Sequence, residues 1–341
     1  MTGNLLFAKG RVARNVLRKR PILTIFDVTK LCNERCPMCN IWKEKSVDMT
    51  LDEIKDRAKA LREFGVGYVF LQGGEPLIRK DIIAIVDIFL NNGIRPTIIS
   101  NGILLTPEIA DQIAERDCNL SISIDSLERE KFALLRGKDS LDKVVNNIRA
   151  LSYLKGRHKG NWSITTTVTK MTELGDIKNL RRFAYDNGFM YAIRPYIHVN
   201  GTAGKEDERL IYDYKNVTEI FNYMAQRAKA ENFLAYLIYQ EHIRYIRGDP
   251  MPECDAMNYS FLMKENGHIS PCIEFPDKEL SLSDFDKQKK QYKPCLDHCN
   301  ASTPCFYNDA REIGFLIRKK WIILRHMPEI LRQMKRYGNF F

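Results

Sequence analysis

Three cysteines close together near the start of the chain are the residues best suited to carry chemistry. Cys32, Cys36 and Cys39 lie in Leu-Cys-Asn-Glu-Arg-Cys-Pro-Met-Cys-Asn, with the spacing Cys-x3-Cys-x2-Cys. Thiolates bind both zinc and iron–sulfur clusters. A cubane cluster has four irons, so three thiolates leave one iron without a protein ligand. Such an open position is typical of a reactive metal site, whereas a zinc knuckle with a distant fourth ligand is the structural alternative.

The elements around the cysteines indicate where they lie. The cysteines follow the apolar segment 22–28, and the sequence Gly-Gly-Glu-Pro at 73–76 follows the next strand-like segment, 68–71. Both motifs therefore fall on loops after the carboxyl ends of strands, where barrel active sites are built.

Strand-like and helix-like segments alternate from residue 21 to about residue 200. The expected strands are 23–28, 68–71, 97–100, 120–124, 163–168 and 191–195. The expected helices are 51–64, 80–91, 106–116, 140–154 and 176–185. Thr50, and Thr106 with Pro107 after it, are typical helix starts. Six such units favour parallel strands with right-handed crossovers in an open, partial barrel.

Together, the cysteine spacing and the Gly-Gly-Glu-Pro sequence resemble the radical S-adenosylmethionine (AdoMet) superfamily, called radical SAM. The resemblance covers roughly residues 21–200 and implies an α/β fold with a partial (β/α)6 TIM-like barrel. In that family the three cysteines bind a catalytic [4Fe–4S] cluster, whose unique iron holds the amino and carboxylate groups of AdoMet. One electron from the cluster cleaves AdoMet to a 5′-deoxyadenosyl radical.

The resemblance also implies a set of AdoMet-binding residues: Met38, Gly73, Gly74, Glu75, Pro76, Ser100, Asn101, Ser123 and Arg136. Met38 takes the position beside the adenine. The two glycines let the backbone approach the methionyl amino group, and Glu75 supplies the negative character that an ammonium group requires.

The polar residues of this set lie at the ends of later strands. Ser100 and Asn101 follow one strand, where the family often contacts the ribose, and Ser123 lies on the next. The alternative for these three is an ordinary turn or strand residue. Arg136, in an Arg-Gly pair, is a candidate to grip the AdoMet carboxylate in a bidentate manner, with a surface salt bridge as the alternative.

A second group of cysteines lies between residues 254 and 305. Cys254, Gly267 and Cys272 resemble the opening Cys-x(9–15)-Gly-x4-Cys of the SPASM and twitch extensions, which hold auxiliary clusters in many radical SAM enzymes. Cys295-x3-Cys299-x5-Cys305 is close to the SPASM run that follows, with one extra residue in its first gap.

Five thiols cannot fill two four-cysteine clusters. The simplest interpretation is one auxiliary [4Fe–4S] cluster, held by Cys254, Cys272 and two of the three later cysteines. The alternatives are two under-ligated clusters that use Asp309 or His298, and a zinc ribbon that only braces the fold. The ninth cysteine, Cys118, precedes a strand and is expected to be a buried apolar residue.

Length and composition suit a cytoplasmic enzyme. The 341 residues suffice for one barrel-sized domain and a small appendage. Nine cysteines without a signal peptide indicate a reducing compartment, and no run of about 18 apolar residues predicts a spanning helix. We expect a basic amphipathic segment (1–20), the partial barrel (21–203), a helical connector (204–250), a SPASM/twitch-like domain (251–310) and a basic C-terminal helix interrupted near Pro328 (311–341).

The net charge of +10 is concentrated at the two ends of the chain. Residues 1–20 hold six basic residues and no acidic one, and residues 311–341 hold eight basic residues against two glutamates. Basic, apolar-faced helices suit the anionic inner face of a membrane. The alternative is that both ends cover the floor of the barrel. An electron donor such as flavodoxin or ferredoxin would also suit a basic surface, and no nucleic-acid-binding motif is present.

These features predict a radical SAM enzyme that modifies an unactivated carbon of its substrate. The basic ends favour a lipid or another hydrophobic substrate. A peptide or protein, as for RiPP or sulfatase maturases, and a cofactor precursor are the alternatives. A non-catalytic iron–sulfur or zinc scaffold is a remote alternative.

Overall fold

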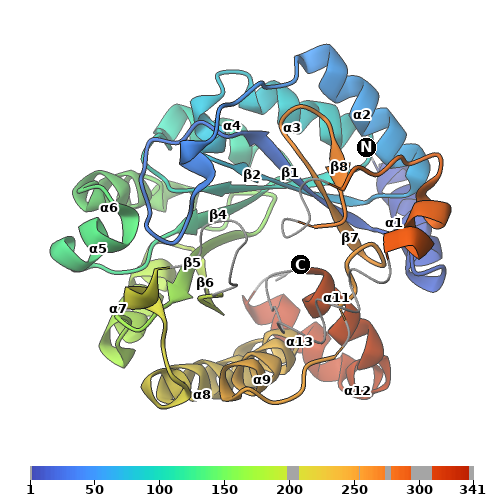
Figure 1. Ribbon diagram of the computed structural model, residues 1–341. Coiled ribbons are helices and arrows are strands. Elements are labelled where there is room, and N and C mark those ends of the chain that lie inside the picture. The colour runs from blue at the N-terminus through green and yellow to red at the C-terminus, as the bar shows by residue number, and fades with distance from the viewer. Residues whose placement is uncertain (1, 198–206, 253, 273–277, 293–308, 338–341) are drawn as a thin grey trace.

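The computed structural model describes residues 2–197, 207–252, 254–272, 278–292 and 309–337. An eight-stranded sheet runs through the molecule in the order β6-β5-β4-β3-β2-β1-β7-β8 (Figure 1). Every pair from β6 to β7 is parallel, and β7 and β8 are antiparallel. The α/β class and the partial barrel predicted from the sequence are confirmed.

The six predicted strands are all present, each within two residues of its expected bounds. The strands are β1 (Leu23–Thr29), β2 (Tyr68–Gly73), β3 (Arg95–Ser100), β4 (Asn119–Ser123), β5 (Trp162–Val168), β6 (Met190–Pro195), β7 (Ser260–Met263) and β8 (Ile269–Ser270). The helices are α1 (Thr2–Leu17), α2 (Leu51–Phe64), α3 (Ile82–Asn91), α4 (Pro107–Ala114), α5 (Arg129–Arg136), α6 (Leu141–Ala150), α7 (Leu174–Asp186), α8 (Tyr214–Glu231), α9 (Phe233–Arg247), α11 (Asp309–Arg318), α12 (Lys320–Arg325) and α13 (Met327–Tyr337). Residues 285–292 are also helical.

Local capping explains why the helix starts could be predicted. The Thr50 hydroxyl accepts a hydrogen bond from the backbone N–H of Glu53, whose side chain reaches back to the Thr50 N–H. This capping box satisfies two backbone donors that the first turn leaves open. Thr106 caps α4 in a similar way, with Pro107 at the first helical position.

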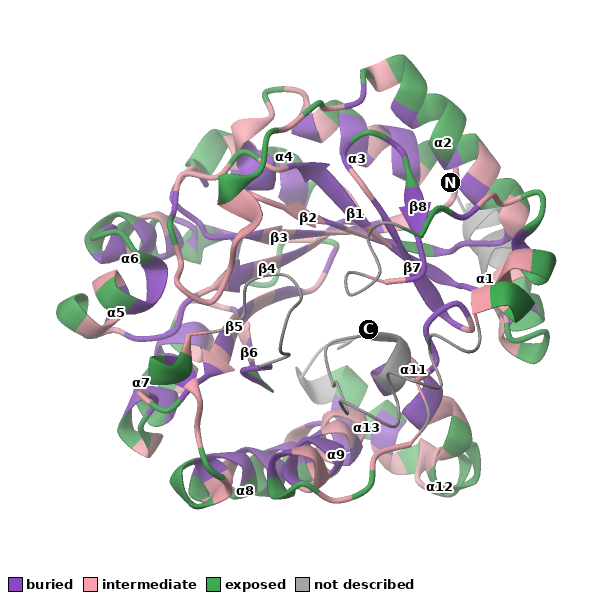
Figure 2. Cartoon of the chain, viewed as in Figure 1, coloured by how far each residue is buried: buried purple, intermediate pink, exposed green. Residues whose placement is uncertain are grey.

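Burial alternates along the central strands and defines two faces of the sheet (Figure 2). In β4 and β5 the buried residues Leu120, Ile122 and Ile164 belong to the main hydrophobic core, which fills the space between the sheet and its helices. The residues between them are only partly exposed and point to the opposite side, which we call the concave face.

The N-terminal helix α1 covers the floor of the barrel, as one of the two sequence interpretations predicted. The Asn15 Nδ2 donates to the carbonyls of Pro21, at 2.8 Å, and Phe64, at 3.1 Å. The Arg11 Nη2 donates to the Gly93 carbonyl, at 3.3 Å. Pro21 and Gly93 come just before β1 and β3, so these contacts lie at the amino ends of the strands.

The C-terminal helices pack elsewhere, against the α8–α9 pair. The Gln333 side chain of α13 accepts from the Phe233 N–H, at 2.7 Å, and donates to the carbonyls of Lys229 and Ala230. The predicted interruption near Pro328 is confirmed, because α12 ends at Arg325 and α13 begins at Met327; a second break, after Arg318, was not predicted. Pro328 lies in the first turn of α13, where no N–H partner is needed.

The hairpin of β7 and β8 extends the barrel sheet on the far side of β1, and the sequence did not predict this pairing. β7 lies parallel to β1, with Leu23 opposite Ser260 and Phe26 opposite Met263. The strand that leads into the first cysteine group therefore lies between two parallel neighbours.

Candidate active site

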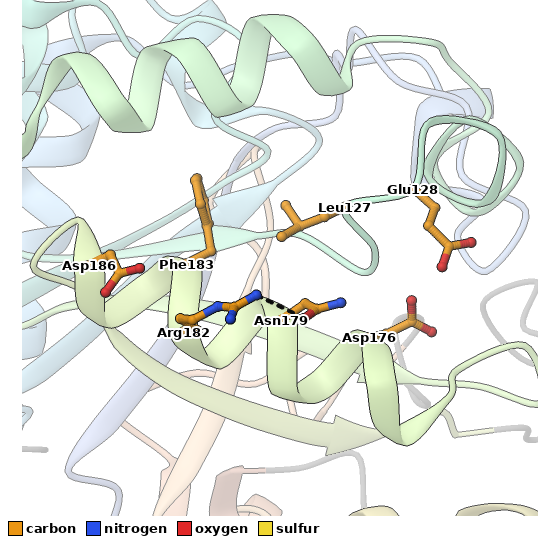
Figure 3. A pocket seen from close by; sticks show the side chains of 7 residues that line it. All are labelled: Leu127, Glu128, Asp176, Asn179, Arg182, Phe183 and Asp186. Atoms are coloured by element: carbon orange, nitrogen blue, oxygen red, sulfur yellow. Dashed lines mark hydrogen bonds between the residues drawn. The ribbon is translucent and has the colours of Figure 1, made fainter.

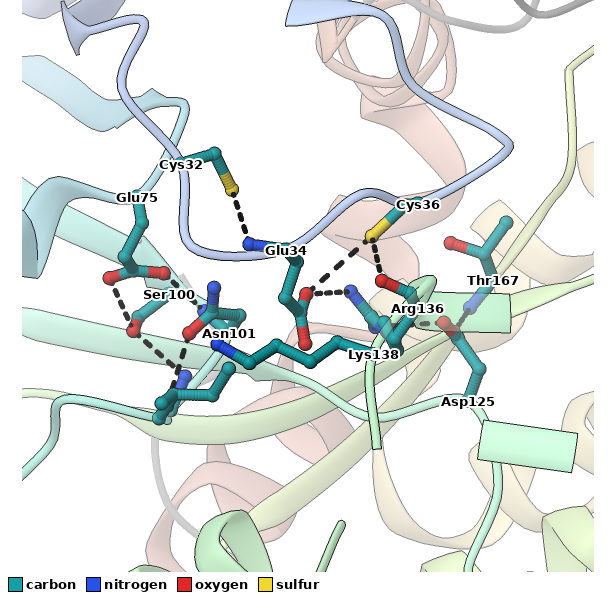
Figure 4. Close-up of polar contacts among 12 residues, drawn as sticks. Cys32, Glu34, Cys36, Glu75, Ser100, Asn101, Asp125, Arg136, Lys138 and Thr167 are labelled. Carbon is teal, nitrogen blue, oxygen red and sulfur yellow. Dashed lines mark hydrogen bonds and ion pairs between the residues drawn. The ribbon is translucent and has the colours of Figure 1, made fainter. Parts of the chain in front are cut away.

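The segment 30–40, which we call the cysteine loop, follows the carboxyl end of β1 (Figure 4). Its three cysteines are half-buried, and the Cys39 N–H donates to the Cys36 carbonyl, at 3.1 Å. Burial raises the pKa of Cys32 and, more strongly, the pKa of Cys36. In the absence of metal both are therefore thiols at neutral pH, and any metal that they bind would displace their protons.

Gly73, the last residue of β2, and Gly74 after it hold one side of the cysteine loop. The Gly74 N–H donates to the Thr29 carbonyl, at 2.7 Å, and the Glu75 N–H donates to the Leu31 carbonyl, at 2.8 Å. A Cβ on Gly73 would lie 2.2 Å from the Thr29 carbonyl oxygen, and one on Gly74 would lie 2.1 Å from the Leu31 carbonyl oxygen. The loop itself therefore accounts for glycine at both positions, and their contact with the methionyl amino group stays a prediction.

The Arg-Gly pair at the end of α5 holds the other side of the loop. The Arg35 N–H donates to the Arg136 carbonyl, at 3.2 Å. Gly137 has φ +62°, and a Cβ there would lie 2.1 Å from the Arg35 carbonyl oxygen. The sequence pointed to Arg136 for its side chain, whereas the structure shows that both residues also position the loop through their backbone.

Glu75 ties together the carboxyl ends of β2 and β3. Its fully buried carboxylate accepts from the Leu77 N–H (3.0 Å), the Ser100 hydroxyl (2.8 Å) and the Asn101 N–H (2.7 Å). Burial raises the pKa of Glu75 to about 7, against the pull of these hydrogen bonds. The Asn101 amide also donates to Asn33 Oδ1 in the cysteine loop, at 2.6 Å. Three predicted AdoMet contacts are thus brought together in one network.

Arg136 lies between two buried carboxylates. Its Nη2 is 2.8 Å from Asp125 Oδ2, and its Nη1 is 3.7 Å from Glu34 Oε2. The other Asp125 oxygen accepts from the Thr167 N–H of β5, at 2.8 Å. Burial raises the pKa of Glu34 despite the nearby guanidinium. The surface salt bridge that the sequence left open is therefore wrong, because Arg136 is buried beside the cysteine loop.

The remaining predicted AdoMet contacts lie around this centre. Met38 packs against the small apolar cluster of Leu135, Tyr196 and Leu210. Pro76 is buried at the first position of a short 3-10 helix, Pro76–Ile78. Ser123 lies on the concave face, opposite Thr165 of β5.

The chain offers the ligands that a three-cysteine cluster requires. Three half-buried thiols lie within eight residues, on a loop fixed at Thr29, Leu31 and Arg35. Over the described ranges, no three His, Cys, Asp or Glu side chains are already arranged to hold a metal ion.

The second cysteine group is described only in part. Cys254 precedes β7 and Cys272 follows β8, and both pack against the core. An antiparallel hairpin brings these two flanks to the same end, and the pairing of Leu23 with Ser260 places that end beside the start of β1. The other candidate ligands of this group lie outside the described residues; they are Cys295, His298, Cys299 and Cys305. Cys118 is fully buried, as expected.

A hollow of about 330 Å³ on the helical side of the sheet is separate from this centre (Figure 3). It lies between α7 and the residues before α5, with Leu127, Asp176 and Phe183 among its lining. Asp176 already pairs with Lys131, at 2.9 Å, so its carboxylate is not available to a ligand.

Two residues of the centre were missed from the sequence. Glu34 lies inside the cysteine motif, and Asp125 lies two residues after β4, at the end of the sequence Ser-Ile-Ser-Ile-Asp. A carboxylate shortly after a barrel strand was the available signal for Asp125. Glu34 gave no signal of this kind, because an acidic residue between two cysteines is normally expected to face solvent.

Comparison with known proteins agrees with this geometry. Residues 26–184 match the model of the Radical SAM superfamily. A probable GTP 3′,8-cyclase of Methanocaldococcus jannaschii is 24% identical over 296 residues, which cover 82% of this chain and 94% of that protein. Mycofactocin maturase MftC of Mycolicibacterium smegmatis is 31% identical over 153 residues, 44% of this chain and 38% of MftC.

A solved structure agrees in fold. Streptococcus suis SuiB bound to S-adenosylmethionine superposes with a TM-score of 0.63 at 18% identity, over 83% of this chain and 68% of SuiB. The partial barrel and its cysteine loop define a radical SAM domain, which the superfamily model matches over residues 26–184. The chain is an enzyme whose cofactors are a [4Fe–4S] cluster and AdoMet.

Proposed function

We propose that this radical SAM enzyme modifies a carbon atom of a peptide that lies across the concave face. The bound cluster and AdoMet supply a 5′-deoxyadenosyl radical, which takes a hydrogen atom from the substrate. Cys32, Cys36 and Cys39 would hold the cluster, and the Glu75 network would shape the AdoMet site.

The observation that carries the choice of substrate is the chemistry of the concave face. In β4 and β5 five of its six residues are hydroxylated, and the sixth is Asn119; the five are Ser121, Ser123, Ser163, Thr165 and Thr167. Ser121 and Thr165 are hydrogen-bonded to each other across the two strands, at 2.8 Å. Hydroxyl groups both donate and accept, so they suit the alternating amide groups of a peptide.

This face gives no support to the lipid substrate favoured by the basic ends. On the described part of the sheet, partly exposed apolar residues of the concave face cluster on β1 to β3, at Ile25, Phe70 and Ile99. An acyl chain lying across β4 and β5 would leave hydroxyl groups without partners, which is unfavourable. Solved structures of this fold include one with AdoMet and the Cp18Cys peptide, at 17% identity and a TM-score of 0.59, which is consistent with a peptide.

The test measures 5′-deoxyadenosine formation by the anaerobically reconstituted enzyme with a chemical reductant, which replaces a flavodoxin or ferredoxin donor. Peptide and lipid fractions of a cell extract are added separately. We expect the peptide fraction to stimulate the reaction and protease treatment of that fraction to abolish the stimulation. Stimulation by the lipid fraction alone would overturn the peptide assignment. The Cys36→Ala variant is the control, and it should form no 5′-deoxyadenosine with any fraction.

We further propose one auxiliary [4Fe–4S] cluster, with Cys254 and Cys272 as two of its ligands. The hairpin supports this assignment, because it brings the two flanks to one end of the sheet. Iron analysis distinguishes the possibilities: about eight irons per chain fit one auxiliary cluster and about twelve fit two. About four irons with bound zinc would instead indicate a zinc ribbon.

A further inference from the structure

Where burial is described, over residues 10–20 and 312–335, the two basic ends of the chain differ in the apolar side chains that they expose. On α1 the described apolar residue Val12 faces Gly67 of the barrel, and Leu17 is exposed on its own at the end of the helix. On α12 and α13 five large apolar side chains are exposed, Trp321, Ile322, Leu324, Leu331 and Met334. We call these five residues the C-terminal apolar set.

Packing against the rest of the molecule does not account for this set. The inward residues Ile323 of α12 and Ile330 of α13 already pack into the small core that Phe315 of α11 shares with α9. Trp321 is 73% exposed and Leu324 is 55% exposed, and they lie three residues apart on α12. Single exposed apolar residues are ordinary on a protein surface, but five within fourteen residues indicate an interaction surface.

Basic residues alternate with the apolar set along α12 and α13. Residues 319–335 hold five basic residues against one carboxylate, Glu329. The basic residues are Lys319, Lys320, Arg325, Arg332 and Lys335. The Lys320 ammonium lies 5.6 Å from the Trp321 ring centroid. Long basic side chains can keep their charge among phosphate groups while their stems and a neighbouring tryptophan enter the interface.

We propose that α12 and α13 form a docking surface for an anionic phospholipid bilayer, on which the enzyme lies as a peripheral protein. A bilayer interface offers phosphate groups for the cations and acyl chains for the tryptophan and aliphatic side chains. An acidic protein would bind the cations but would leave the exposed apolar side chains without a partner. Within the described ranges no helix is both long and apolar enough to cross a membrane. The docking surface is separate from the cysteine loop, so this proposal does not depend on the peptide assignment.

Flotation of the full chain with vesicles tests the proposal at low salt. Vesicles of phosphatidylcholine with phosphatidylglycerol are compared with vesicles of phosphatidylcholine alone. We expect binding only to the anionic vesicles, with a blue shift of tryptophan fluorescence. The double variant Trp321→Glu and Leu324→Glu should lower the partition coefficient by about tenfold or more.

A matched control separates the docking surface from net charge. Leu17 (85% exposed) and Val47 (74% exposed) are equally apolar and accessible but lie outside α12 and α13. The Leu17→Glu and Val47→Glu double variant changes the net charge by the same amount and should bind within about twofold of the parent. The proposal is overturned if both double variants lose vesicle binding equally or if neither loses any. It is also overturned if the parent does not bind anionic vesicles. Tight binding to a flavodoxin through the same residues without vesicle binding would also overturn it. Circular dichroism confirms that both variants fold.

Discussion

Replacing Gly137 by alanine should damage the cysteine loop without touching any cysteine. Gly137 adopts φ +62°, and an added Cβ would lie 2.1 Å from the Arg35 carbonyl oxygen and 2.5 Å from its carbonyl carbon. The nearest approach that real Cβ atoms tolerate is about 3.0 Å, so the Arg35 backbone must retreat by about 1 Å. Cys36 is the next residue along the chain and must move with it.

The expected cost has two parts. Placing alanine in the left-handed region costs about 1 kcal/mol, and forcing extra volume into a packed site typically costs about 1–3 kcal/mol more. We therefore expect Gly137→Ala to lower the free energy of unfolding of the cluster-free protein by about 2–4 kcal/mol. The catalytic cluster should also assemble poorly, because one of its three ligands is displaced.

Gly156 provides a control for the cost of the left-handed backbone without the steric clash. It has φ +71°, but a Cβ added there would meet no heavy atom within 4 Å. Gly156→Ala should therefore cost about 1 kcal/mol and leave the iron content unchanged. Urea unfolding followed by circular dichroism and iron analysis after reconstitution measure both effects. If the two variants are indistinguishable in both measurements, the proposed clamping of the cysteine loop by Gly137 is refuted.

Two further substitutions test buried charges. Burial raises the pKa of Asp27 to about 6, so its contribution to stability is greatest below about pH 4 and is lost as the pH rises through 6. Asp27→Asn can still accept the Gln72 hydrogen bond. In urea unfolding, the free energy of unfolding should rise by up to about 3 kcal/mol at pH 8 and change little at pH 4. An equal rise at the two pH values would contradict the raised pKa. Burial alone would raise the pKa of Glu312, but the charge of Arg194 and the hydrogen bond with His242 lower it to about 2. The ionised Glu312 carboxylate therefore stabilises the fold above about pH 4.3, and this contribution is lost as the pH falls toward 2. Glu312→Gln should lower the free energy of unfolding by about 2–3 kcal/mol at pH 7 and speed proteolysis at α11. An unchanged midpoint of urea unfolding would count against this role of Glu312.

The barrel could be predicted from the sequence because its signals are local. Thr50 and Thr106 start their helices through hydrogen bonds to residues three positions later, and each strand is a short segment that is apolar throughout or at alternate positions. The cysteine loop could be placed because it follows such a run. These features depend on neighbours in the chain, so a single sequence contains them in full.

The missed features depend on residues far apart in the chain. The four residues of β7 are all buried and carry no alternation, so nothing in them indicates pairing with β1. Arg136 could be chosen as a site residue from its Arg-Gly pair, but its partners Glu34 and Asp125 are brought to it only by the fold. The polar concave face could have been predicted from alternating serines and threonines, yet the basic ends drew the substrate prediction toward lipids.

The pairing of β1 with β7 has a consequence for how the enzyme is made. The Thr24 hydroxyl donates to the Phe261 carbonyl across 237 positions of sequence, at 3.4 Å. During synthesis β1 therefore keeps one open edge until the ribosome has released the chain beyond Met263, and chains emerge at about 5–20 residues per second. Iron delivered before that moment would meet a loop whose supporting strand is paired on one side only. Cluster insertion is thus expected to follow translation, on a chain that has already closed its sheet.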